Sequence, residues 1–337
     1  MEVKRVILSR TDSIGDVILT LPMAGLLKQI YPSVQIIFLG SSYTREIVKC
    51  SSNIDLFVDW NMIQKEDSES QIKLFQNLNA DAIVHVFPGR EIARLAKAAK
   101  IPLRIGTTGR LYHYLYCNKL VPLTRRRSLL HEAELNIKLL QPFGVTNTVP
   151  LNKLPDLYGF RNSQAIGPEI SKPIDKSKFN LILHPKSKGS AREWGVWNFS
   201  NLIKILPADR FKIFITGTHE EGVKIKSELI DPFPGVIDLT GKLTLAELIG
   251  FIDAADGLVA ASTGPLHIAA ALGKFALGLY PPIKPMHPGR WAPIGIKADY
   301  LVLNKKCSKC RKGFQCECLE GITPESVKSK LMSWLNG

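Results

Sequence analysis

Segments with the composition of buried strands alternate with helical stretches along the whole chain. In the first half the predicted strands are 3–9, 34–40 and 81–87, and the predicted helices are 22–31, 90–99 and 129–144. In the second half the predicted strands are 179–185, 211–217, 236–241, 257–262 and 275–281, and the predicted helices are 197–206, 244–255 and 265–273. Strands joined through helices pair in parallel with right-handed crossovers. The pattern therefore predicts an α/β protein built from doubly wound parallel sheets.

The chain is too long for one ordinary hydrophobic core. It has 337 residues, of which 45% are hydrophobic and 22% charged, the balance of a soluble globular protein. Residues 145–178 are rich in Pro, Asn, Ser and Lys and show little periodicity, which is typical of a connection. We expect two domains, 1–165 and 166–337, with the last helix at 323–335 either in the second domain or packed back on the first.

No apolar run reaches the length of a membrane span, and the first residues lead directly into a strand. This start excludes a signal peptide and predicts a cytoplasmic protein. Its six cysteines are then expected to be reduced or bound to metal.

The net charge of +14 is concentrated in one segment. Residues 90–127 contain ten Lys or Arg and one acid, Glu91. Such a cluster is typical of a protein with an anionic partner, whether nucleic acid, a membrane surface or an acidic substrate. A solvated helix face explains Arg94 and Lys97 equally well. The adjacent Arg125, Arg126 and Arg127 repel one another and gain most from an anion.

The first strand-to-helix junction carries a carboxylate, Asp16, rather than a glycine-rich phosphate loop. Ligands of parallel α/β sheets bind at the carboxyl ends of the strands, so Asp16 is a candidate for acid/base work. Ser13 and Asp16 also have the spacing of a capping box, and the helix would then run on through Val17, Ile18 and Leu21. The spacing by itself favours the cap.

The junction at 261–273 has the features of an anion site. Ser262 or Thr263 can cap the following helix, Gly264 allows close backbone approach, and Pro265 opens the helix. Free N–H groups at a helix start suit a diphosphate, and His267 in the first turn can face it. The alternative is a well-capped core helix whose histidine bonds to the backbone.

Two other loops of the second half carry charges after predicted strands. Lys186, Lys188 and Arg192 follow the strand 179–185 in a loop of small residues and suit a phosphate group. Glu220 and Glu221 follow the strand 211–217, where a carboxylate can accept hydrogen bonds from sugar hydroxyls or complement a helix dipole. Basic loops are also common on so basic a protein.

Cys307, Cys310, Cys316 and Cys318 form a C-x2-C-x5-C-x-C pattern in a lysine-rich segment. Four thiols this close together can hold a structural zinc ion. The short loop and tight C-x-C half differ from ordinary zinc ribbons, so ordinary packing stays open as well.

Seven segments, in this order, resemble glycosyltransferase family 9, the bacterial heptosyltransferases of the lipopolysaccharide inner core. They are RTDSIGDVILTLP, LLHEAELN, HPKSKGSAREW, ITGTHEE, DLTGKLTLAEL, STGPLHIAAALG and the cysteine tail ending in ITPESV. The resemblance covers nearly the whole chain. It implies the GT-B fold, in which two Rossmann-like domains face a cleft, the first binding the acceptor and the second the nucleotide sugar.

The resemblance also implies roles for individual residues. Asp16 matches the family's general base. Expected donor contacts are Lys186, Ser187, Lys188, Arg192, Glu220, Glu221, Ser262, Thr263, Gly264 and His267. Expected acceptor contacts are Arg10, Thr11, Ser13, Gly15, Arg90, Arg125, Arg126 and Arg127. The basic residues would hold the carboxylates and phosphates of the acceptor, and the enzyme would touch the inner membrane surface.

The implied reaction is a direct displacement with inversion, in which an ADP-sugar is the donor and no metal ion or other cofactor is required. One position departs from the family pattern: Ser262 stands where an Asp usually contacts donor hydroxyls. A family member that uses a different nucleotide sugar is therefore the main alternative. A nucleic-acid-binding protein is a remote alternative that no recognised motif supports.

Overall fold

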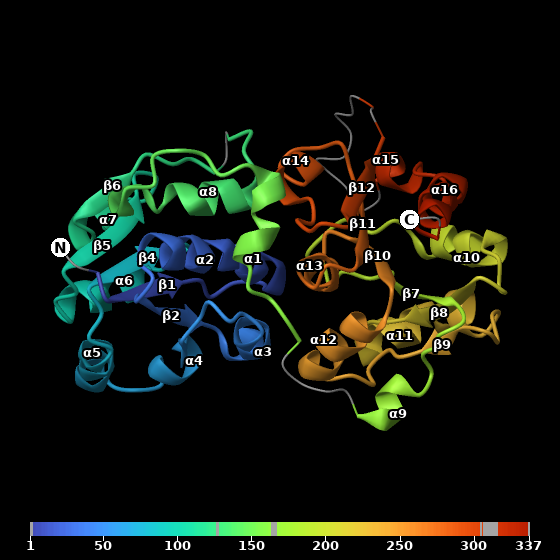
Figure 1. Cartoon of the computed structure of the whole chain (residues 1–337), viewed down its shortest axis with the longest axis horizontal. Helices are drawn as coiled ribbons and strands as arrows, with labels where there is room; N and C mark the ends of the chain where they lie inside the picture. Colours follow the sequence, from blue (N-terminus) through green and yellow to red (C-terminus); the bar gives the residue numbers. More distant parts are fainter. Residues whose placement is uncertain (1–2, 126–127, 163–166, 304, 306–315, 336–337) are drawn as a thin grey trace. The chain divides into compact units, whose positions relative to one another are not determined.

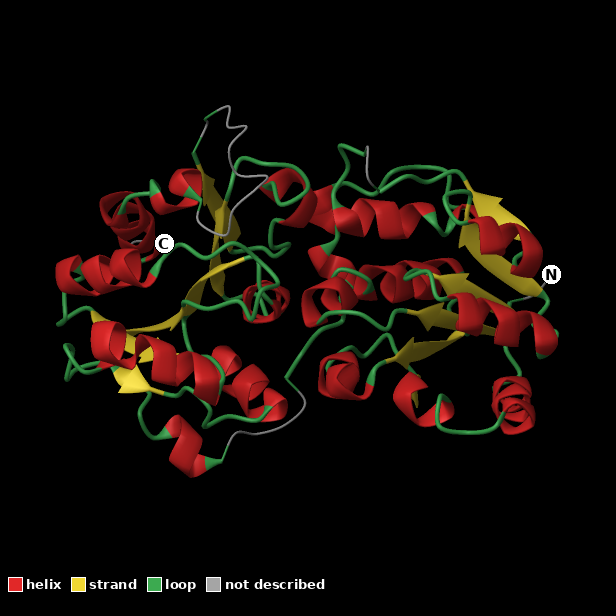
Figure 2. Cartoon of the chain, turned by 180° about the vertical axis from the view of Figure 1, so that it is seen from behind, coloured by secondary structure: helices red, strands yellow, loops and turns green. Residues whose placement is uncertain are grey.

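The computed structural model describes residues 3–125, 128–162, 167–303, 305 and 316–335 (Figure 1). The chain divides into two compact units, residues 1–163 and 164–337. Each unit contains one parallel sheet whose two faces are covered by helices (Figure 2). The predicted α/β class with doubly wound parallel sheets is confirmed.

The sheet of the first unit has, among its described residues, six strands in the order β3-β2-β1-β4-β5-β6. The strands are β1 (Arg5–Ser9), β2 (Gln35–Gly40), β3 (Leu56–Asp59), β4 (Ala82–His85), β5 (Leu103–Thr107) and β6 (Lys119–Val121). The helices are α1 (Ile14–Ile18), α2 (Leu21–Ile30), α3 (Arg45–Lys49), α4 (Trp60–Ile63), α5 (Ser68–Asn77), α6 (Arg90–Ala98), α7 (Leu111–Tyr116) and α8 (Glu132–Lys138).

The sheet of the second unit has the same order when its strands are counted in chain sequence, β12-β11-β10-β7-β8-β9. The strands are β7 (Phe179–His184), β8 (Phe211–Ile215), β9 (Ile237–Asp238), β10 (Gly257–Ala261), β11 (Phe275–Tyr280) and β12 (Ala298–Val302). The helices are α9 (Pro168–Ser171), α10 (Val196–Ile205), α11 (His219–Ile225), α12 (Leu245–Ala254), α13 (Gly264–Ala271), α14 (Pro288–Trp291), α15 (Glu317–Glu320) and α16 (Pro324–Trp334).

Each sheet has a point where the strand order reverses. In the first unit it lies between the paired strands β1 and β4, and in the second between β7 and β10. Loops on either side of such a point diverge to opposite faces of the sheet and leave room for a ligand at the carboxyl ends of the strands. The topology therefore selects the loops after these four strands as binding positions.

The burial of each strand explains whether it could be predicted from the sequence. Central strands such as β1, whose Val6, Ile7 and Leu8 are fully buried, pack on both faces and give continuous apolar runs. β3, β5, β6 and β12 were not predicted, because they lie toward the sheet edges and mix exposed or polar residues into short strands.

Three details differ from the predicted elements. The first helix is interrupted, with α1 ending at Ile18 and α2 beginning at Leu21, one residue before Pro22. Part of the segment 145–178, which was expected to be a connection, packs into the first unit. Leu157 and Tyr158 are buried there, and Phe160 forms a β-bridge with Ser51. The last helix, α16, packs on α10, so its apolar face is used within its own unit.

Among the described residues, none of the helices combines the length and apolarity needed to cross a membrane.

Candidate functional site

Asp16 lies on α1, directly after the loop that follows β1. Its carboxylate accepts hydrogen bonds from the Arg10 guanidinium through Oδ1 and from the Ser13 hydroxyl through Oδ2. The predicted capping box is wrong, because the Ser13 side chain accepts no backbone N–H and instead donates to Asp16. The carboxylate is therefore oriented by two side-chain donors while 17% of the side chain stays exposed.

Arg10 is the centre of a charge network beneath this loop. Its side chain is only 3% exposed, and its guanidinium binds Asp12 through two hydrogen bonds of 2.6 and 2.9 Å. The same group reaches Glu132 of α8 at 3.2 Å. A planar guanidinium with five donors suits such multiple contacts, so Arg10 links three carboxylates.

Arg125 completes the network from the other side. Its Nε donates to Glu132 Oε1 at 2.9 Å, and its Nη2 donates to the Val86 carbonyl and to Asn136 Oδ1, each at 3.0 Å. Asn136 in turn donates to the Leu19 carbonyl at 3.0 Å, next to the end of α1. Glu132 is 1% exposed, and its burial is tolerable because both arginines neutralise it.

The network changes the proton affinity of its members. Burial and the neighbouring charge of Asp16 raise the pKa of Asp12 to about 6, although Arg10 opposes this shift. Burial tends to lower the pKa of Arg10, but Asp16, Asp12 and Glu132 outweigh it and raise that pKa above its ordinary value. Arg10 therefore stays positively charged at any working pH.

The other predicted acceptor residues are distributed around this loop. The Thr11 carbonyl accepts a hydrogen bond of 2.7 Å from Ser41, Gly15 is buried within α1, and exposed Arg90 begins α6 after β4. Arg126 and Arg127 lie outside the described residues. Arg10 and Arg125, predicted to hold the acceptor, have the internal carboxylate partners described above.

In the second unit, the loop after β7 is organised by Glu193. This carboxylate accepts hydrogen bonds from the Lys186 ammonium and from the Ser187 backbone N–H, the latter at 3.0 Å. Lys188 has a positive φ of 49°, and its backbone N–H donates to Glu221 Oε1 at 2.9 Å. Glu193 was not among the predicted site residues, although it lies within the quoted segment HPKSKGSAREW.

Glu221 has two structural contacts besides the one to the Lys188 backbone. With Thr218 it forms a capping box at the start of α11, where its Oε2 accepts from the Thr218 N–H at 2.9 Å. Glu220, at the preceding position, is exposed, and hydrogen bonds to its carboxylate from its own backbone and from Thr218 lower its pKa. Of the two acids, only Glu220 is left facing solvent.

The start of α13 follows β10 at the reversal point of the second sheet. Thr263 is its N-cap residue, is 5% exposed, and has a buried hydroxyl with no hydrogen-bond partner among the described residues. In the first turn Pro265 has no N–H and the His267 N–H donates to the Thr263 carbonyl, which leaves the Gly264 and Leu266 N–H groups without partners within the helix. This turn can bind an anion, and the Thr263 hydroxyl is available to the same ligand.

The remaining predicted donor residues surround these loops. Ser262 is half-buried and lies near the Tyr280 hydroxyl, which donates to the Trp291 carbonyl. His267 is buried in the first turns of α13, and half-buried Arg192 belongs to the loop after β7. Burial lowers the pKa of His184, at the end of β7, to about 4, so this imidazole stays neutral near pH 7.

The structure describes two of the four cysteines in the C-x2-C-x5-C-x-C pattern. Cys307 and Cys310 lie outside the described residues, whereas Cys316 and Cys318 are buried at the start of α15 within the core of the second unit. In the part of the chain that the structure describes, no group of His, Cys, Asp or Glu side chains is arranged to hold a metal ion.

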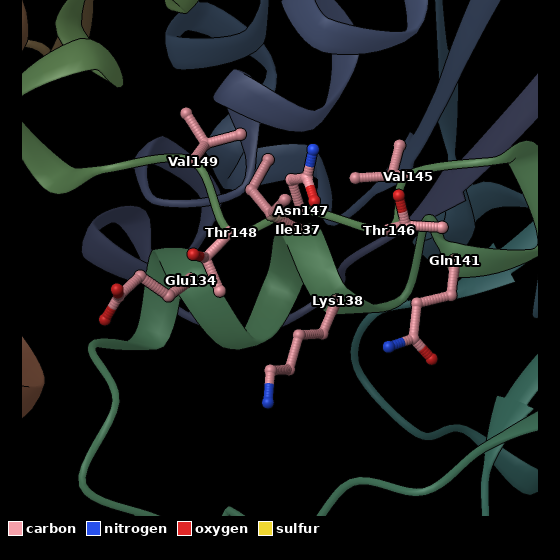
Figure 3. A pocket seen from close by; sticks show the side chains of 9 residues that line it. All are labelled: Glu134, Ile137, Lys138, Gln141, Val145, Thr146, Asn147, Thr148 and Val149. Carbon is pink, nitrogen blue, oxygen red and sulfur yellow. The ribbon is translucent and has the colours of Figure 1, made fainter.

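A small pocket lies between α8 and the segment 145–149 (Figure 3). Its lining includes Glu134 and Lys138 of α8 and Gln141, which follows α8. These residues lie on a different face of the helix from Glu132 and Asn136. Glu134 is already used, because its carboxylate accepts from the His131 N–H at 2.7 Å in the capping box of α8. The pocket therefore does not belong to the network around Asp16.

Comparison with known proteins identifies the family of this chain. Residues 72–319 match the sequence model of glycosyltransferase family 9 (heptosyltransferase). A Haemophilus influenzae protein, provisionally named a glycosyltransferase, is 25% identical over 308 residues, 86% of each chain. Lipopolysaccharide heptosyltransferase 3 of Escherichia coli is 24% identical over 284 residues, 79% of this chain and 80% of its own.

A solved structure extends the likeness to the fold. The E. coli ADP-heptose lipopolysaccharide heptosyltransferase II superposes with a TM-score of 0.76 over 99% of this chain and 98% of its own, at 19% identity. The two sheets thus have the GT-B fold that the sequence resemblance implied.

Proposed function

This chain belongs to glycosyltransferase family 9, and on that premise we propose that it transfers a heptose from ADP-heptose to a hydroxyl of an acidic lipopolysaccharide inner-core acceptor. The names of its relatives support the substrate class. The E. coli protein of similar fold is an ADP-heptose lipopolysaccharide heptosyltransferase, and an E. coli relative is lipopolysaccharide heptosyltransferase 3.

The observation that carries the mechanism is the partly exposed Asp16 carboxylate held by Arg10 and Ser13 at the reversal point of the first sheet. In the proposed reaction Asp16 accepts the proton of the acceptor hydroxyl while the oxygen forms a bond to the anomeric carbon. The bond from that carbon to the β-phosphate oxygen breaks, and ADP leaves. A single displacement of this kind inverts the anomeric configuration.

Arg10 acts in this proposal as a positioning residue. Its contacts to Asp12, Asp16 and Glu132 fix its guanidinium, and the fixed guanidinium fixes the Asp16 carboxylate. A catalytic group held by a packed supporting network loses little energy to reorganisation during the reaction. Glu132 and Arg125 extend this support to α8.

The donor diphosphate is proposed to bind at the start of α13. Supporting this are the Gly264 and Leu266 N–H groups, which have no partners within the helix, and the buried Thr263 hydroxyl. Lys188 and Arg192, in the loop that Glu193 orders, would neutralise the negative charge that develops on the leaving ADP. Such stabilisation requires no metal ion at the diphosphate, so added Mg²⁺ or Mn²⁺ should not raise turnover.

The remaining donor contacts follow from the same arrangement. Exposed Glu220 is proposed to bind ribose hydroxyls, while Glu221, Lys186 and Ser187 hold the loop in shape through the contacts already described. Gly264 and His267 belong to the α13 start, and Ser262 would face the sugar.

The acceptor is proposed to carry acidic groups and to lie at a membrane surface. Exposed Arg90 at the start of α6 supports an anionic acceptor, and Arg126 and Arg127 are proposed to act with it. Nucleic acid is not the proposed partner, since neither the family nor any sequence motif points to it.

Ser262 favours one alternative donor specificity. Its neutral hydroxyl stands where the family pattern has a carboxylate, which would bind sugar hydroxyls more strongly. A second candidate function is therefore transfer of a different nucleotide-linked sugar in surface-glycan synthesis by the same mechanism.

A panel of nucleotide sugars tests both candidates. Thermal shift and turnover are measured with ADP-heptose, other ADP-sugars, UDP-sugars and GDP-sugars, using wild type and Asp16→Asn. We expect ADP-heptose to stabilise both proteins and the substitution to lower kcat by about 10²- to 10⁴-fold. Stabilisation by a different sugar nucleotide supports the second candidate, and failure of every nucleotide sugar to bind would refute both.

The four cysteines are proposed, from their spacing, to hold a structural zinc ion. Metal analysis of the purified protein should find about one zinc ion per chain in wild type and less in Cys316→Ser. A wild-type protein free of bound metal, yet fully folded and active, would contradict this proposal.

A further inference from the structure

One helix of the first unit turns an apolar face to solvent. On α7, Leu111 is 87% exposed, Tyr114 57% and Leu115 63%. These positions are spaced i, i+3 and i+4, so the three side chains form one continuous stripe. Single exposed apolar residues are ordinary, but a contiguous stripe on one helix marks an interaction surface.

The opposite face of α7 is firmly anchored. His113 is fully buried, its Nδ1 accepts from the Thr107 N–H at 2.9 Å, and its ring contacts that of Tyr112 at 4.8 Å between centroids. The Arg104 guanidinium donates to the Tyr116 carbonyl at 2.8 Å. The apolar stripe is therefore presented by a fixed helix rather than by a loose end.

Cations surround this stripe. Lys97 of α6, which packs against α7, donates to the Leu115 carbonyl at 2.8 Å. Arg94 lies one turn earlier on α6, exposed Arg110 precedes Leu111, and exposed Lys119 begins the edge strand β6. The sequence contains no acidic residue between Glu91 and Glu132, so nothing in this segment offsets their charge.

We propose that α7 and its flanking cations form a docking surface for an anionic lipid bilayer. Leucine and tyrosine side chains flanked by basic residues can insert at the boundary between lipid headgroups and acyl chains. Each nearby Lys or Arg strengthens attraction to an anionic leaflet roughly fivefold. Nucleic acid would leave the leucines in water, so the apolar stripe favours a bilayer.

This inference specifies which surface makes the membrane contact that we proposed above. Only its purpose, the capture of a lipid-linked acceptor, rests on the proposed function. Lipid binding itself needs neither donor nor acceptor. The two proposals can therefore fail separately: vesicle binding tests the surface, and nucleotide-sugar turnover tests the chemistry.

The experiment measures co-sedimentation of the full chain with vesicles of phosphatidylglycerol and phosphatidylethanolamine, and with vesicles of phosphatidylcholine alone. Wild type should bind the anionic vesicles far more strongly, and added salt should weaken binding. Leu111→Ser with Leu115→Ser should reduce binding at least tenfold. Arg110→Gln with Lys119→Gln should reduce binding to anionic vesicles about tenfold or more.

Val223→Ser with Ile296→Ser is the matched control, because these residues of the second unit are 65% and 82% exposed. This pair should bind vesicles like wild type, and every variant should keep the wild-type thermal shift with ADP. Equal vesicle binding by the α7 variants and wild type would overturn the proposal. So would retention on RNA without vesicle binding, or a wild-type dimer that the leucine substitutions convert to a monomer without affecting lipid binding.

Discussion

At the scale of single residues, the site depends on how two carboxylates share one guanidinium. Asp12 and Asp16 both bind Arg10, and burial raises the pKa of Asp12 to about 6. Sequence analysis identified Asp16 and overlooked Asp12, since a loop aspartate next to Ser13 is more often a turn residue. The contact of Asp12 with Arg10 was visible only in three dimensions.

Asp12→Asn should change how stability depends on pH. Because the folded protein holds the Asp12 proton more tightly than the unfolded chain does, this group contributes stability that is fully present below about pH 4 and lost as pH rises through about 6. The unfolding free energy of wild type relative to Asp12→Asn, measured in denaturant titrations, should therefore fall by on the order of 1–2 kcal/mol between about pH 4.5 and about pH 7.5. A difference that does not vary with pH would contradict this.

At the scale of elements, the carboxyl end of β4 contains an unusual buried group. His85 is fully buried, neither ring nitrogen has a hydrogen-bond partner among the described residues, and its ring stacks on His113 at 5.7 Å between centroids. Burial is the main cause that lowers the pKa of His85 to about 3, and the nearby charges of His113 and Arg104 lower this pKa further. β4 and α7 are thus packed through neutral imidazoles.

His85→Leu should make the protein less sensitive to acid. Since the pKa of His85 is lowered on folding, the stability it contributes is present above about pH 6.5 and declines as pH falls toward about 3. Leucine has similar bulk and cannot take up a proton. Between about pH 7 and pH 4, the variant should lose less unfolding free energy than wild type, by on the order of 1–3 kcal/mol, in denaturant titrations. Parallel losses in the two proteins would show that His85 is not responsible.

At the scale of the whole molecule, two units with the same strand order each have their own core and their own reversal point. The proposed base lies in the first unit and the proposed diphosphate site in the second. The two halves of the reaction would therefore depend on different residues, so their loss should be separable by kinetics.

Asp16→Asn and Thr263→Val should affect different steps. Asp16→Asn should lower kcat and leave the ADP dissociation constant unchanged, whereas Thr263→Val should weaken ADP about five- to tenfold because one hydrogen bond is lost. The double variant should show both effects with a coupling below about 0.5 kcal/mol. Thr263→Ser, which keeps the hydroxyl, is the control and should resemble wild type; a Thr263→Val protein with unaltered ADP binding would refute the assigned role.

The sequence by itself determined the fold class and the positions of the loops that are proposed to carry the chemistry. Fully buried central strands such as β1 and β10 require continuous apolar runs, and local helix and turn preferences mark where each strand ends. For this reason Asp16, Thr263 and the basic loop after β7 could be proposed as site residues from the sequence.

Only the tertiary structure decided which side chains act together. Arg10 and Glu132 are 122 positions apart in the chain, and no local pattern pairs them. Strand order brings their elements together and gives Arg10 and Arg125, which were expected to bind an anionic acceptor, carboxylate partners within the protein. Strand order arises from packing between distant segments, which is why β5, with its polar Arg104 and Thr107, the short strand β6 and the exposed face of α7 could not be predicted from local sequence.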